Sequence, residues 1–294
     1  MKPVAFDYCC PDSVEEALEA LASHEDAKLM AGGQSLMPML NFRVVKPTLI
    51  VDIGKLIELD YLRELDDGGL SVGALTRHRV METSNVVTRR FPIIPETMQN
   101  VAHLAIRNRG TIGGSISHAD PAAELPMMMR LLDATIVVRS VEGERSIAAG
   151  DFFIAPLTTA LAENEMVVRI DLPGLPIGMG WCFQEFARRA GDFALAAVGV
   201  LLDVQDGIIS EARVAMMGVA DTPIRRHDAE AVLVGKSLTD DVIAATVAAA
   251  CDSLEPSRDL HASPDFRRHL ASVLTARVLR TAWGRATGVC HEQV

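Results

Sequence analysis

The first fifty residues alternate between helical and strand-like spacing of apolar positions. An apolar residue at every third or fourth position predicts a helix with one buried stripe, made of Val14, Ala17, Leu18 and Leu21. Asp12 or Ser13 is placed to cap the amino end of this helix. The helix therefore begins within a residue or two of Ser13.

Two short apolar runs, Ala27–Ala31 and Thr48–Ile53, predict strands. After the first run, Gly32-Gly33-Gln34-Ser35 predicts a turn, and a helix is expected from Leu36. Because strand, helix and strand follow one another, this part of the chain is expected to form a small α/β unit.

The middle of the chain has a mixed pattern. Tyr61–Ala74 predicts two strands around an Asp-Asp-Gly-Gly turn, which is a strong hairpin signal. Thr76–Val101 predicts helix with a break near Pro92 and Pro95, and the glycine-rich segment Arg109–Asp120 follows. One helix and two strands are expected next, at Pro121–Leu132, Thr135–Ser140 and Val167–Leu172.

Pro173–Gly180, with its prolines and glycines, marks a domain boundary. Beyond it, a short helix is expected at Asp228–Leu233, and Thr239–Ala286 is expected to be mainly helical. Three strands precede these helices, at Trp181–Ala187, Leu195–Val204 and Ile209–Val219, with a turn at Gln205-Asp206-Gly207. The fold class is therefore α+β, with an α/β part at 1–57, a second part at 58–176 and a C-terminal domain of three-stranded sheet plus helices at 177–294.

Composition narrows the class of protein. Of the 294 residues, 49% are hydrophobic and 23% charged, which excludes a largely disordered chain. The net charge of −11 disfavours nucleic acid as a partner. Apolar runs such as Leu195–Leu202 are far shorter than the roughly 20 residues of a membrane span. Met1–Asp7 has no apolar signal segment, so the cytoplasm is the expected location.

The five cysteines are Cys9, Cys10, Cys182, Cys251 and Cys290. Their odd number and scattered positions do not form a disulfide framework. They include no CxxC pair, and no histidine lies at ligand spacing from two of them, so no zinc or iron–sulphur centre is expected in this chain. The adjacent pair Cys9-Cys10 is expected to serve packing or a subunit contact.

The first candidate site is the segment from Met30 to Leu36, which contains the pair Gly32-Gly33. Consecutive glycines allow a ligand to approach the backbone closely, and free N–H groups ahead of a helix attract anions. The alternative is a strand-to-helix turn in which the glycines and a capping Ser35 serve only the chain itself.

The second candidate site runs from Arg107 to Pro121 and contains Gly113-Gly114. Its hydroxyl groups can bind phosphate oxygens while the glycines leave room for a diphosphate. Asp120 and Pro121 suit the N-cap and first position of the next helix. The alternative is a long surface loop ahead of a well-capped helix. Two glycine-pair segments in one domain favour a dinucleotide held between them.

Other nucleotide and hydrolase motifs are missing from the sequence. Neither segment matches G-x-G-x-x-G with an acidic residue about 20 positions later, and no G-x-x-x-x-G-K-[ST] is present. The chain also lacks G-x-S-x-G and H-E-x-x-H. These absences disfavour the dinucleotide fingerprint, P-loop hydrolases and the simplest hydrolase classes.

Three segments together resemble the FAD-binding medium subunit of the molybdenum hydroxylases, the xanthine dehydrogenase and carbon monoxide dehydrogenase family. They are AGGQSL at Ala31–Leu36, TIGGSISHADPAAE at Thr111–Glu124, and FQEFARRAGDFALAAVG at Phe183–Gly199. The resemblance covers nearly the whole chain in the right order. It implies the two-subdomain FAD-binding fold of the vanillyl-alcohol oxidase (PCMH) type, followed by a C-terminal α+β domain.

The resemblance also implies where FAD binds. The backbone around Ala31–Ser35 and Thr111–Ser115 would hold the diphosphate, and Asp120 would orient its loop. Glu124 would contact the ribose or adenosine side, and Val167 would pack against the cofactor. The implied cofactor-binding positions are Ala31, Gly32, Gly33, Gln34, Ser35, Leu36, Ala102, Gly110, Thr111, Ile112, Gly113, Gly114, Ser115, Asp120, Glu124, Val167, Gln184, Arg188 and Phe193.

Gln184–Phe193 corresponds to the segment that approaches the isoalloxazine ring in the family. Many relatives have a lysine near Gln184 or Glu185, and this chain has none there. Arg188 or Arg189 is a candidate to supply the positive charge near the flavin, with a solvated basic pair as the alternative. Phe193 is a candidate to cover the ring, or else a core residue.

By the same resemblance, this chain carries no catalytic residue and no metal. A large subunit with the molybdenum cofactor and a small subunit with two [2Fe–2S] clusters are the expected partners, as a dimer of heterotrimers. Electrons would pass from the clusters through FAD to an external acceptor. An autonomous flavin oxidase or reductase of the same fold is the alternative function, and a non-catalytic binding module is a third. The organic substrate and the acceptor stay open.

Overall fold

The structure is a computed structural model that describes residues 1–288. It divides into two compact units. Unit 1 comprises Met1–Met81, His103–Ala119 and Asp133–Pro173. Unit 2 comprises Glu82–Ala102, Asp120–Leu132 and the chain from Gly174 onward. Cys290 lies outside the described residues.

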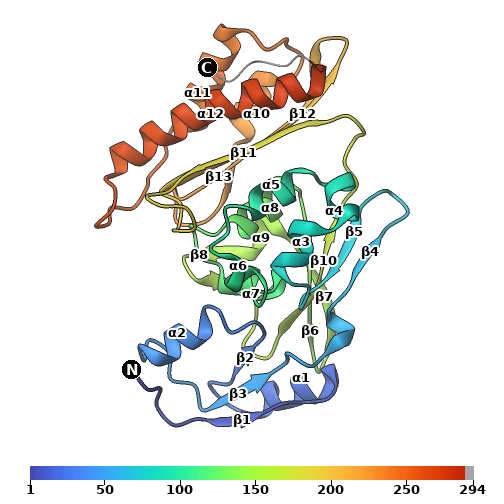
Figure 1. Cartoon of the computed structure of the whole chain (residues 1–294), viewed down its shortest axis with the longest axis vertical. Coiled ribbons are helices and arrows are strands. Elements are labelled where there is room, and N and C mark those ends of the chain that lie inside the picture. The colour runs from blue at the N-terminus through green and yellow to red at the C-terminus, as the bar shows by residue number, and fades with distance from the viewer. Residues whose placement is uncertain (289–294) are drawn as a thin grey trace. The chain divides into compact units, whose positions relative to one another are not determined.

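Unit 1 begins with a three-stranded parallel sheet, in the order β1-β3-β2. The strands β1 (Asp7–Cys9), β2 (Lys28–Met30) and β3 (Leu49–Asp52) lie side by side in the lower part of Figure 1. The helix α1 (Val14–Ser23) buries the predicted stripe against this sheet, and α2 (Leu36–Asn41) follows β2. Ser13 caps α1 by accepting a hydrogen bond from the Glu16 N–H at 3.2 Å. The expected α/β start of the chain is confirmed.

A five-stranded antiparallel sheet completes unit 1. Its order is β4-β5-β10-β6-β7. The strands are β4 (Leu62–Glu64), β5 (Leu70–Gly73), β6 (Thr135–Ser140), β7 (Gly143–Ala148) and β10 (Met166–Leu172). The predicted hairpin and the strands at 135–140 and 167–172 are confirmed, whereas β7 was not predicted. Short elements surround this sheet: η1 (Ile57–Leu59), α9 (Ala149–Phe152), β8 (Phe153–Ala155) and β9 (Thr158–Thr159).

The predicted helical stretch Thr76–Val101 is three short helices, α3 (His78–Thr83), α4 (Asn85–Arg90) and α5 (Ile93–Met98). Breaks occur at Ser84 and at Phe91-Pro92. The break expected at Pro95 is wrong, because Pro95 lies in the first turn of α5, where its missing N–H costs no hydrogen bond.

The glycine-rich segment is more helical than its sequence indicated. It contains α7 (Ile112–His118), which follows α6 (Leu104–Arg107). Ala119 ends α7 in the left-handed conformation, with φ of 51°. The prediction that Asp120 caps a helix starting at Pro121 is wrong. Asp120 instead accepts a hydrogen bond from the Ala122 N–H at 2.8 Å, and α8 (Glu124–Leu131) begins three residues after Pro121.

Unit 2 is built on an antiparallel sheet in the order β11-β12-β13-β14. Its strands are β11 (Gly180–Phe186), β12 (Ala196–Gln205), β13 (Ile208–Met217) and β14 (Ile224–Arg225). The three predicted strands and the turn at Asp206-Gly207 are confirmed, and both turn residues have positive φ. The fourth strand, only two residues long, was not predicted.

Three helices follow this sheet: α10 (His227–Leu233), α11 (Asp240–Cys251) and α12 (Pro264–Thr287). The long helix α12 runs across β11 and β12, as Figure 1 shows. Residues 252–263 are not helical, which corrects the expectation of a mainly helical stretch there. Met127, Met128 and Met129 on α8 are fully buried, so these methionines pack in the interior.

Arg267 on α12 is a buried structural residue of unit 2, only 6% exposed. Its guanidinium donates to the carbonyl oxygens of Leu195 at 2.5 Å and Gly218 at 3.1 Å. It also forms an ion pair with Asp259 at 2.7 Å. This side chain therefore ties α12 to the ends of β12 and β13.

Within residues 1–288, none of the helices combines the length and apolar character needed to cross a membrane.

Candidate cofactor site

The first glycine segment is pressed against the second. Gly32 is buried, and a Cβ placed on it would lie 2.9 Å from the carbonyl carbon of Arg109 and 3.0 Å from the Cα of Gly110. Such distances leave no space for a side chain, so only glycine allows the two backbones to approach this closely. Gly33 has a φ of +70°, which also favours glycine. The predicted convergence of the two distant segments is confirmed.

The first segment presents free backbone donors. Among the described residues, no acceptor receives a hydrogen bond from the N–H groups of Gly32, Gly33, Gln34 or Ser35. The Gln34 side chain folds back and donates to the Gly32 carbonyl at 2.9 Å. Ser35 makes no capping hydrogen bond, so the alternative of a self-satisfied turn capped by Ser35 is wrong. Successive free amides of this kind form a concave anion-binding surface.

The second segment uses its amides differently. The N–H groups of Ile112 and Gly113 donate to the carbonyls of Thr76 and Ala74, at 3.0 and 2.9 Å. The Gly114 N–H donates to the Thr111 hydroxyl at 3.1 Å, which makes Thr111 the N-cap of α7. A Cβ on Gly113 would lie 2.7 Å from that of Ala74. This glycine therefore leaves room for the neighbouring strand end.

His78 packs against the second segment and forms hydrogen bonds with its backbone. Its backbone N–H donates to the Gly110 carbonyl at 2.9 Å, and its Nε2 lies 3.0 Å from the Thr111 carbonyl. Burial lowers the pKa of His78 to about 4, so the ring is neutral at pH 7 and Nε2 carries the proton that Thr111 accepts. The ring also lies 2.9 Å from the Cβ position of Gly110, so it packs directly under that glycine.

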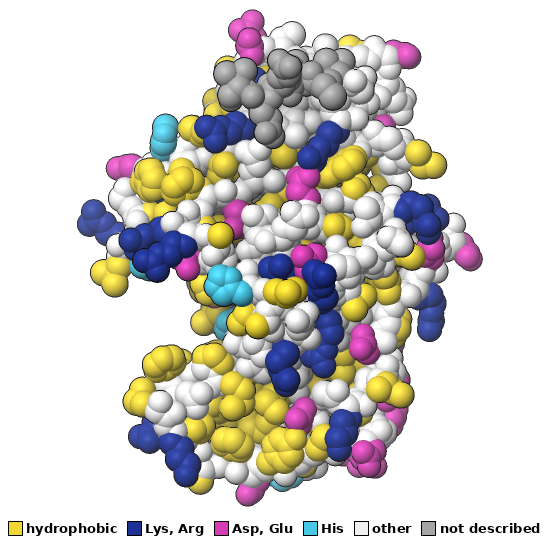
Figure 2. Space-filling view, viewed as in Figure 1, with side chains coloured by type: hydrophobic (Ala, Val, Ile, Leu, Met, Phe, Trp, Pro, Cys, Tyr) yellow, Lys and Arg dark blue, Asp and Glu magenta, His cyan; other side chains and the backbone are white. Residues whose placement is uncertain are grey.

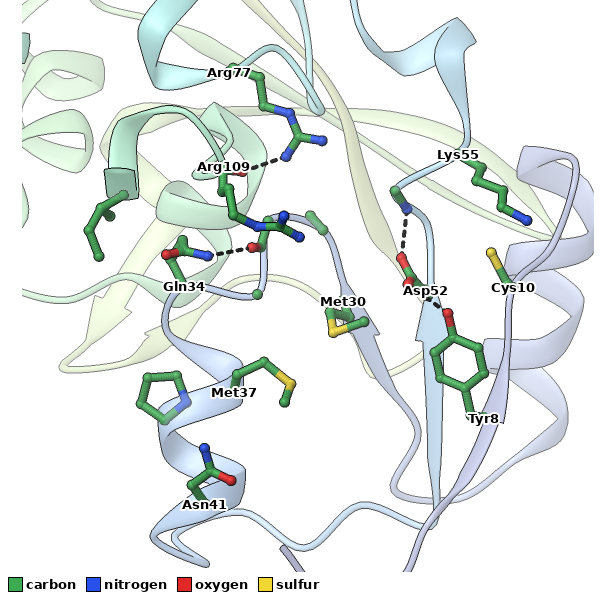
Figure 3. Close-up of a pocket in the computed structure, with 16 residues that line it drawn as sticks. Tyr8, Cys10, Met30, Gln34, Met37, Asn41, Asp52, Lys55, Arg77 and Arg109 are labelled. Carbon is green, nitrogen blue, oxygen red and sulfur yellow. Dashed lines mark hydrogen bonds between the residues drawn. The ribbon is translucent and has the colours of Figure 1, made fainter. Parts of the chain in front are cut away.

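A cleft of about 930 Å³ opens beside the first segment, wholly within unit 1. It lies where the three parallel strands end, since Cys10, Ala31 and Gly54, which follow β1, β2 and β3, all line it. Ligands of α/β proteins bind at this carboxyl edge of parallel strands. Figure 3 shows the side chains around the cleft, which come from β1, β2, β3, α2 and the segments that hold Lys55, Arg77 and Arg109.

The cleft carries more positive than negative charge. Lys55, Arg77 and Arg109 line it and have no acidic partner among the described residues. Arg77 donates to the backbone carbonyl of Arg109. The one carboxylate in the lining, Asp52, accepts hydrogen bonds from the Tyr8 hydroxyl at 2.7 Å and the Gly54 N–H at 2.9 Å. Although the net charge of the chain is −11, Lys and Arg side chains stand out on the face shown in Figure 2. The cleft therefore suits an anionic ligand.

The predicted residues of unit 1 fall into three groups. Ala31–Leu36 belongs to the first segment and Gly110–Ser115 to the second, and the Cβ of Ala31 lies 3.9 Å from the Cβ position of Gly114. Val167 lies on β10, opposite Val138, with 4% of its surface exposed. The structure thus brings the first two groups together, while Val167 is part of the antiparallel sheet.

The other predicted residues belong to unit 2. Glu124 is buried at the start of α8, and burial, with Glu185 as a second cause, raises its pKa to about 8. Burial also raises the pKa of Glu185 to about 7. Ala102 has a φ of +44°, unusual for a residue with a side chain. The remaining positions in unit 2 are Asp120, Gln184, Arg188 and Phe193.

Two of these residues were left with alternatives by the sequence. Phe193 is 65% exposed, so the core alternative is wrong. The Arg188 guanidinium is exposed, and its Nη1 lies 2.9 Å from Nδ1 of His261. Glu185, one of the two positions near which a lysine was expected from the resemblance, lies on β11 with one buried carboxylate oxygen that has no partner among residues 1–288.

Several residues of the cleft were not among the predicted set: Tyr8, Asp52, Lys55, Arg77 and Arg109. A signal for Asp52 was present in the sequence, because it ends the strand predicted at Thr48–Ile53. The rule that places ligands at the ends of parallel strands would have selected it. Arg109 lies within the second candidate segment, Arg107–Pro121, although it was not among the predicted binding positions, whereas Arg77 had no such signal, since its position depends on how the segments meet. No cluster of His, Cys, Asp or Glu that could hold a metal occurs in residues 1–288, and four of the cysteines are free.

Comparison with known families decides the identity of the cofactor domain. Residues 4–175 match the FAD binding domain in molybdopterin dehydrogenase, and residues 181–282 match the CO dehydrogenase flavoprotein C-terminal domain. The chain belongs to the FAD-binding medium subunits of the molybdenum hydroxylases. The predicted cofactor FAD, the oxidoreductase class and the fold are thereby confirmed.

Relatives of this medium-subunit family match over nearly their whole length. Subunit alpha of the 6-hydroxypseudooxynicotine dehydrogenase complex of Paenarthrobacter nicotinovorans is 43% identical over 97% of both chains. Quinoline 2-oxidoreductase from Pseudomonas putida 86 matches with a TM-score of 0.93 and 40% identity, over 99% of this chain and 100% of that one. Carbon monoxide dehydrogenase from Hydrogenophaga pseudoflava matches with a TM-score of 0.94 and 36% identity, over 97% and 99%.

The residues present fit FAD. A diphosphate needs several donors in a concave arrangement, and the four free amides of Gly32–Ser35 supply them. The unpaired cations of the cleft add charge of the required sign.

Proposed function

We propose that this chain is the electron-transfer subunit of a molybdenum-dependent hydroxylase or dehydrogenase. It receives electrons from two [2Fe–2S] clusters of a small subunit and passes them through FAD to an external acceptor. A large subunit with the molybdenum cofactor completes the assembly, as a dimer of heterotrimers. The cytoplasmic location and the division into 1–57, 58–176 and 177–294 stay predictions. The family matches at 4–175 and 181–282 support the last boundary.

The run of four free amides at Gly32–Ser35 is the observation that carries this proposal. In a folded protein nearly all buried or half-buried amides have partners, so the successive free donors of buried Gly32 and half-buried Gly33 and Gln34 indicate an exogenous acceptor, which the exposed Ser35 amide can also reach. The relatives support the rest. Their names give three different substrates, yet they resemble this chain about equally along its length. A subunit that handles electrons, rather than substrate, explains that pattern.

The chain's own residues bind and orient the cofactor. The amides of Gly32–Ser35 hold the diphosphate, and the contact of Gly32 with Arg109 and Gly110 fixes the first segment against the second. His78 keeps the carbonyl of Thr111 turned inward through its Nε2–H. When bound, FAD supplies the ability to accept electrons one at a time and to release them in pairs. No acid, base or nucleophile of this chain acts on the organic substrate.

Arg188 and Arg189 are proposed to adjust the flavin potential. A guanidinium near the ring stabilises the extra negative charge of the reduced flavin, and therefore raises its midpoint potential. Arg188→Ala and Arg189→Ala should lower the potential measured by spectroelectrochemical titration. If both variants keep the wild-type potential, the two arginines are only a solvated pair.

The proposal is tested on the full chain, expressed with and without its neighbouring genes. The purified protein should show flavin absorption near roughly 370 and 450 nm. The colour should leave the protein on acid precipitation, because a covalent link is a property of many autonomous oxidases. Stepwise reduction of the assembled complex by substrate should bleach the flavin only when the iron–sulphur subunit is present. Bleaching by substrate with this chain alone would favour the autonomous oxidase instead.

A further inference from the structure

The cleft contains a carboxylate that the binding of a diphosphate does not explain. Asp52 lies at the carboxyl end of β3, in the lining of the same cleft as the free amides of Gly32–Ser35. A bare anion would repel this carboxylate, so its presence indicates that part of the ligand donates hydrogen bonds. We propose that Asp52, held by Tyr8, binds the ribose hydroxyls of the ADP half of FAD. This proposal rests on the proposed function.

The side chain of Asp52 is fixed before any ligand arrives. Tyr8 donates its hydroxyl to Oδ2 at 2.7 Å, and the Gly54 N–H donates to Oδ1 at 2.9 Å. Figure 3 shows these two bonds on the wall of the cleft opposite Gln34. The bond to Asp52 is the main cause that raises the pKa of Tyr8 to about 12, so the tyrosine stays a donor at every working pH. Each carboxylate oxygen keeps a further lone pair for a ligand.

The shape and lining of the cleft fit an adenosine diphosphate group. Its volume of about 930 Å³ exceeds the needs of a diphosphate alone and falls in the range of nucleotide-sized sites. Met30, Met37, Pro38 and Ile106 offer apolar surface for a base. Arg77 and Arg109 provide positive charge for the phosphates, while Asp52 is the one carboxylate of the lining.

The two free lone pairs of Asp52 select the ribose among the donors of adenosine. Those donors are the 2′ and 3′ hydroxyls and the amino group of the base. Two adjacent hydroxyls can meet both carboxylate oxygens at once, whereas a single amino group satisfies one. A carboxylate at the end of a parallel strand that binds a ribose hydroxyl is a known solution of dinucleotide sites. Here the strand order places it beside the glycine turn without the usual sequence fingerprint.

The test measures binding of ADP and its analogues to the flavin-free full chain by calorimetry. For the wild type, 2′-deoxy-ADP or 3′-deoxy-ADP should bind about tenfold more weakly than ADP, as expected for the loss of a hydrogen bond to a charged group. For Asp52→Asn, ADP should bind about tenfold more weakly than to wild type, and the deoxy analogue should bind as ADP does, within about twofold. Tyr8→Phe should weaken ADP binding by about threefold.

The sign of the Asp52 effect separates recognition from bulk electrostatics. Removing a negative charge near a diphosphate would strengthen binding if charge alone mattered. Asp7→Asn is the matched control, since it removes the same charge from the amino end of β1, outside the cleft lining. It should leave ADP binding unchanged or slightly stronger.

Four results would overturn the assignment. The first is equal affinity of the wild type for ADP and both deoxy analogues, and the second is ADP binding to Asp52→Asn as tight as to wild type. The third is a selective loss of affinity for inosine diphosphate, which lacks the amino group. The fourth is undiminished ADP binding to FAD-loaded protein. A chain that binds FAD normally but shows one of them keeps the proposed function and loses this inference. A wild-type chain and complex that bind no FAD lose both.

Discussion

Glu124 is a buried carboxyl whose protonation should control the stability of unit 2. Burial raises its pKa from 4.5 to about 8, with Glu185 as the second cause. At pH 7 the unfolded chain releases this proton, while the folded chain retains it. At pH 7 the solution is 2.5 units above the unfolded pKa of 4.5, and each unit is worth about 1.4 kcal/mol. Keeping Glu124 protonated therefore costs the folded state about 3 kcal/mol. The cost falls below about 1 kcal/mol at pH 5, because that pH lies only half a unit above the unfolded pKa.

Glu124→Gln removes the titratable group and keeps the shape of the protonated side chain. We expect this variant to raise the free energy of unfolding by about 3 kcal/mol at pH 7 and by less than about 1 kcal/mol at pH 5. Urea denaturation of the flavin-free chain, followed by tryptophan fluorescence, measures the change, since Trp181 and Trp283 both belong to unit 2. Glu255→Gln, at an exposed position of the same unit, should change stability by less than about 0.5 kcal/mol at either pH.

The pH dependence of stability tests the protonation of Glu124 more directly than the size of the effect. Stability of the wild type should decline as pH rises from 5 to 8, because the folded state then binds more protons than the unfolded state. A stabilisation by Glu124→Gln that is equal at pH 5 and pH 7 would show that the carboxyl is not protonated in the fold. A loss of stability at pH 7 would show the same.

Three further predictions concern other positions. Gly32→Ala places a Cβ against the Arg109 carbonyl, and the flavin-to-protein absorbance ratio of the purified chain should fall at least about tenfold. The lowered pKa of His78 means that the unfolded state takes up a proton first as pH falls from 6.5 toward 4, so the stability of unit 1 should fall by up to about 3 kcal/mol. Hydrogen exchange of the amides at 110–115 measures this loss, and His78→Gln should abolish it. Arg267→Met strips one buried and one partly buried carbonyl of their donor and should lower the stability of unit 2 by about 3 kcal/mol in the urea assay. Arg280→Met, which removes an exposed ion pair from the same helix, should cost less than about 1 kcal/mol; equal losses would contradict the role of Arg267.

Elements with strong periodicity could be predicted from the sequence to within two residues. The helix α1 and the strands β6, β11 and β12 owe their form to apolar side chains on one face or in one run, and the sequence displays that pattern directly. The strand β7 was missed because only Ile147 is buried in it. Such an edge strand exists through its pairing with β6, which no local pattern reveals.

The glycine-rich helix α7 shows why local rules failed at the second segment. Two adjacent glycines disfavour helix by roughly 1 kcal/mol each, so the sequence indicated a loop. In the structure, the amides of Ile112 and Gly113 bond to Thr76 and Ala74, residues more than thirty positions away. These bonds orient the first turn, and Thr111 caps it. Ala119 ends α7 in the left-handed conformation and turns the chain away from it. The following helix therefore does not begin at Pro121.

The site was predicted where it depends on backbone and missed where it depends on strand order. Two glycine pairs can converge because backbones without side chains can approach closely, and the glycines that allow this approach are visible in the sequence. Tyr8 and Asp52 are 44 positions apart and carry no motif. They meet because β1 pairs with β3 in parallel, with Tyr8 opposite Ile50, so the tyrosine ring reaches the end of the neighbouring strand.

Binding of a cofactor by main-chain groups constrains the sequence of such a subunit less than binding by side chains does. The donors proposed for the diphosphate are main-chain groups, which among substitutions at Gln34 or Ser35 only proline removes, whereas the close approach at Gly32 tolerates no side chain. Within the first segment, constraint on the sequence therefore falls on the glycines rather than on the side chains of Gln34 and Ser35. A cofactor held mainly by backbone can persist while the rest of the chain adapts to new partners. That is the arrangement expected when substrates change and the path of the electrons does not.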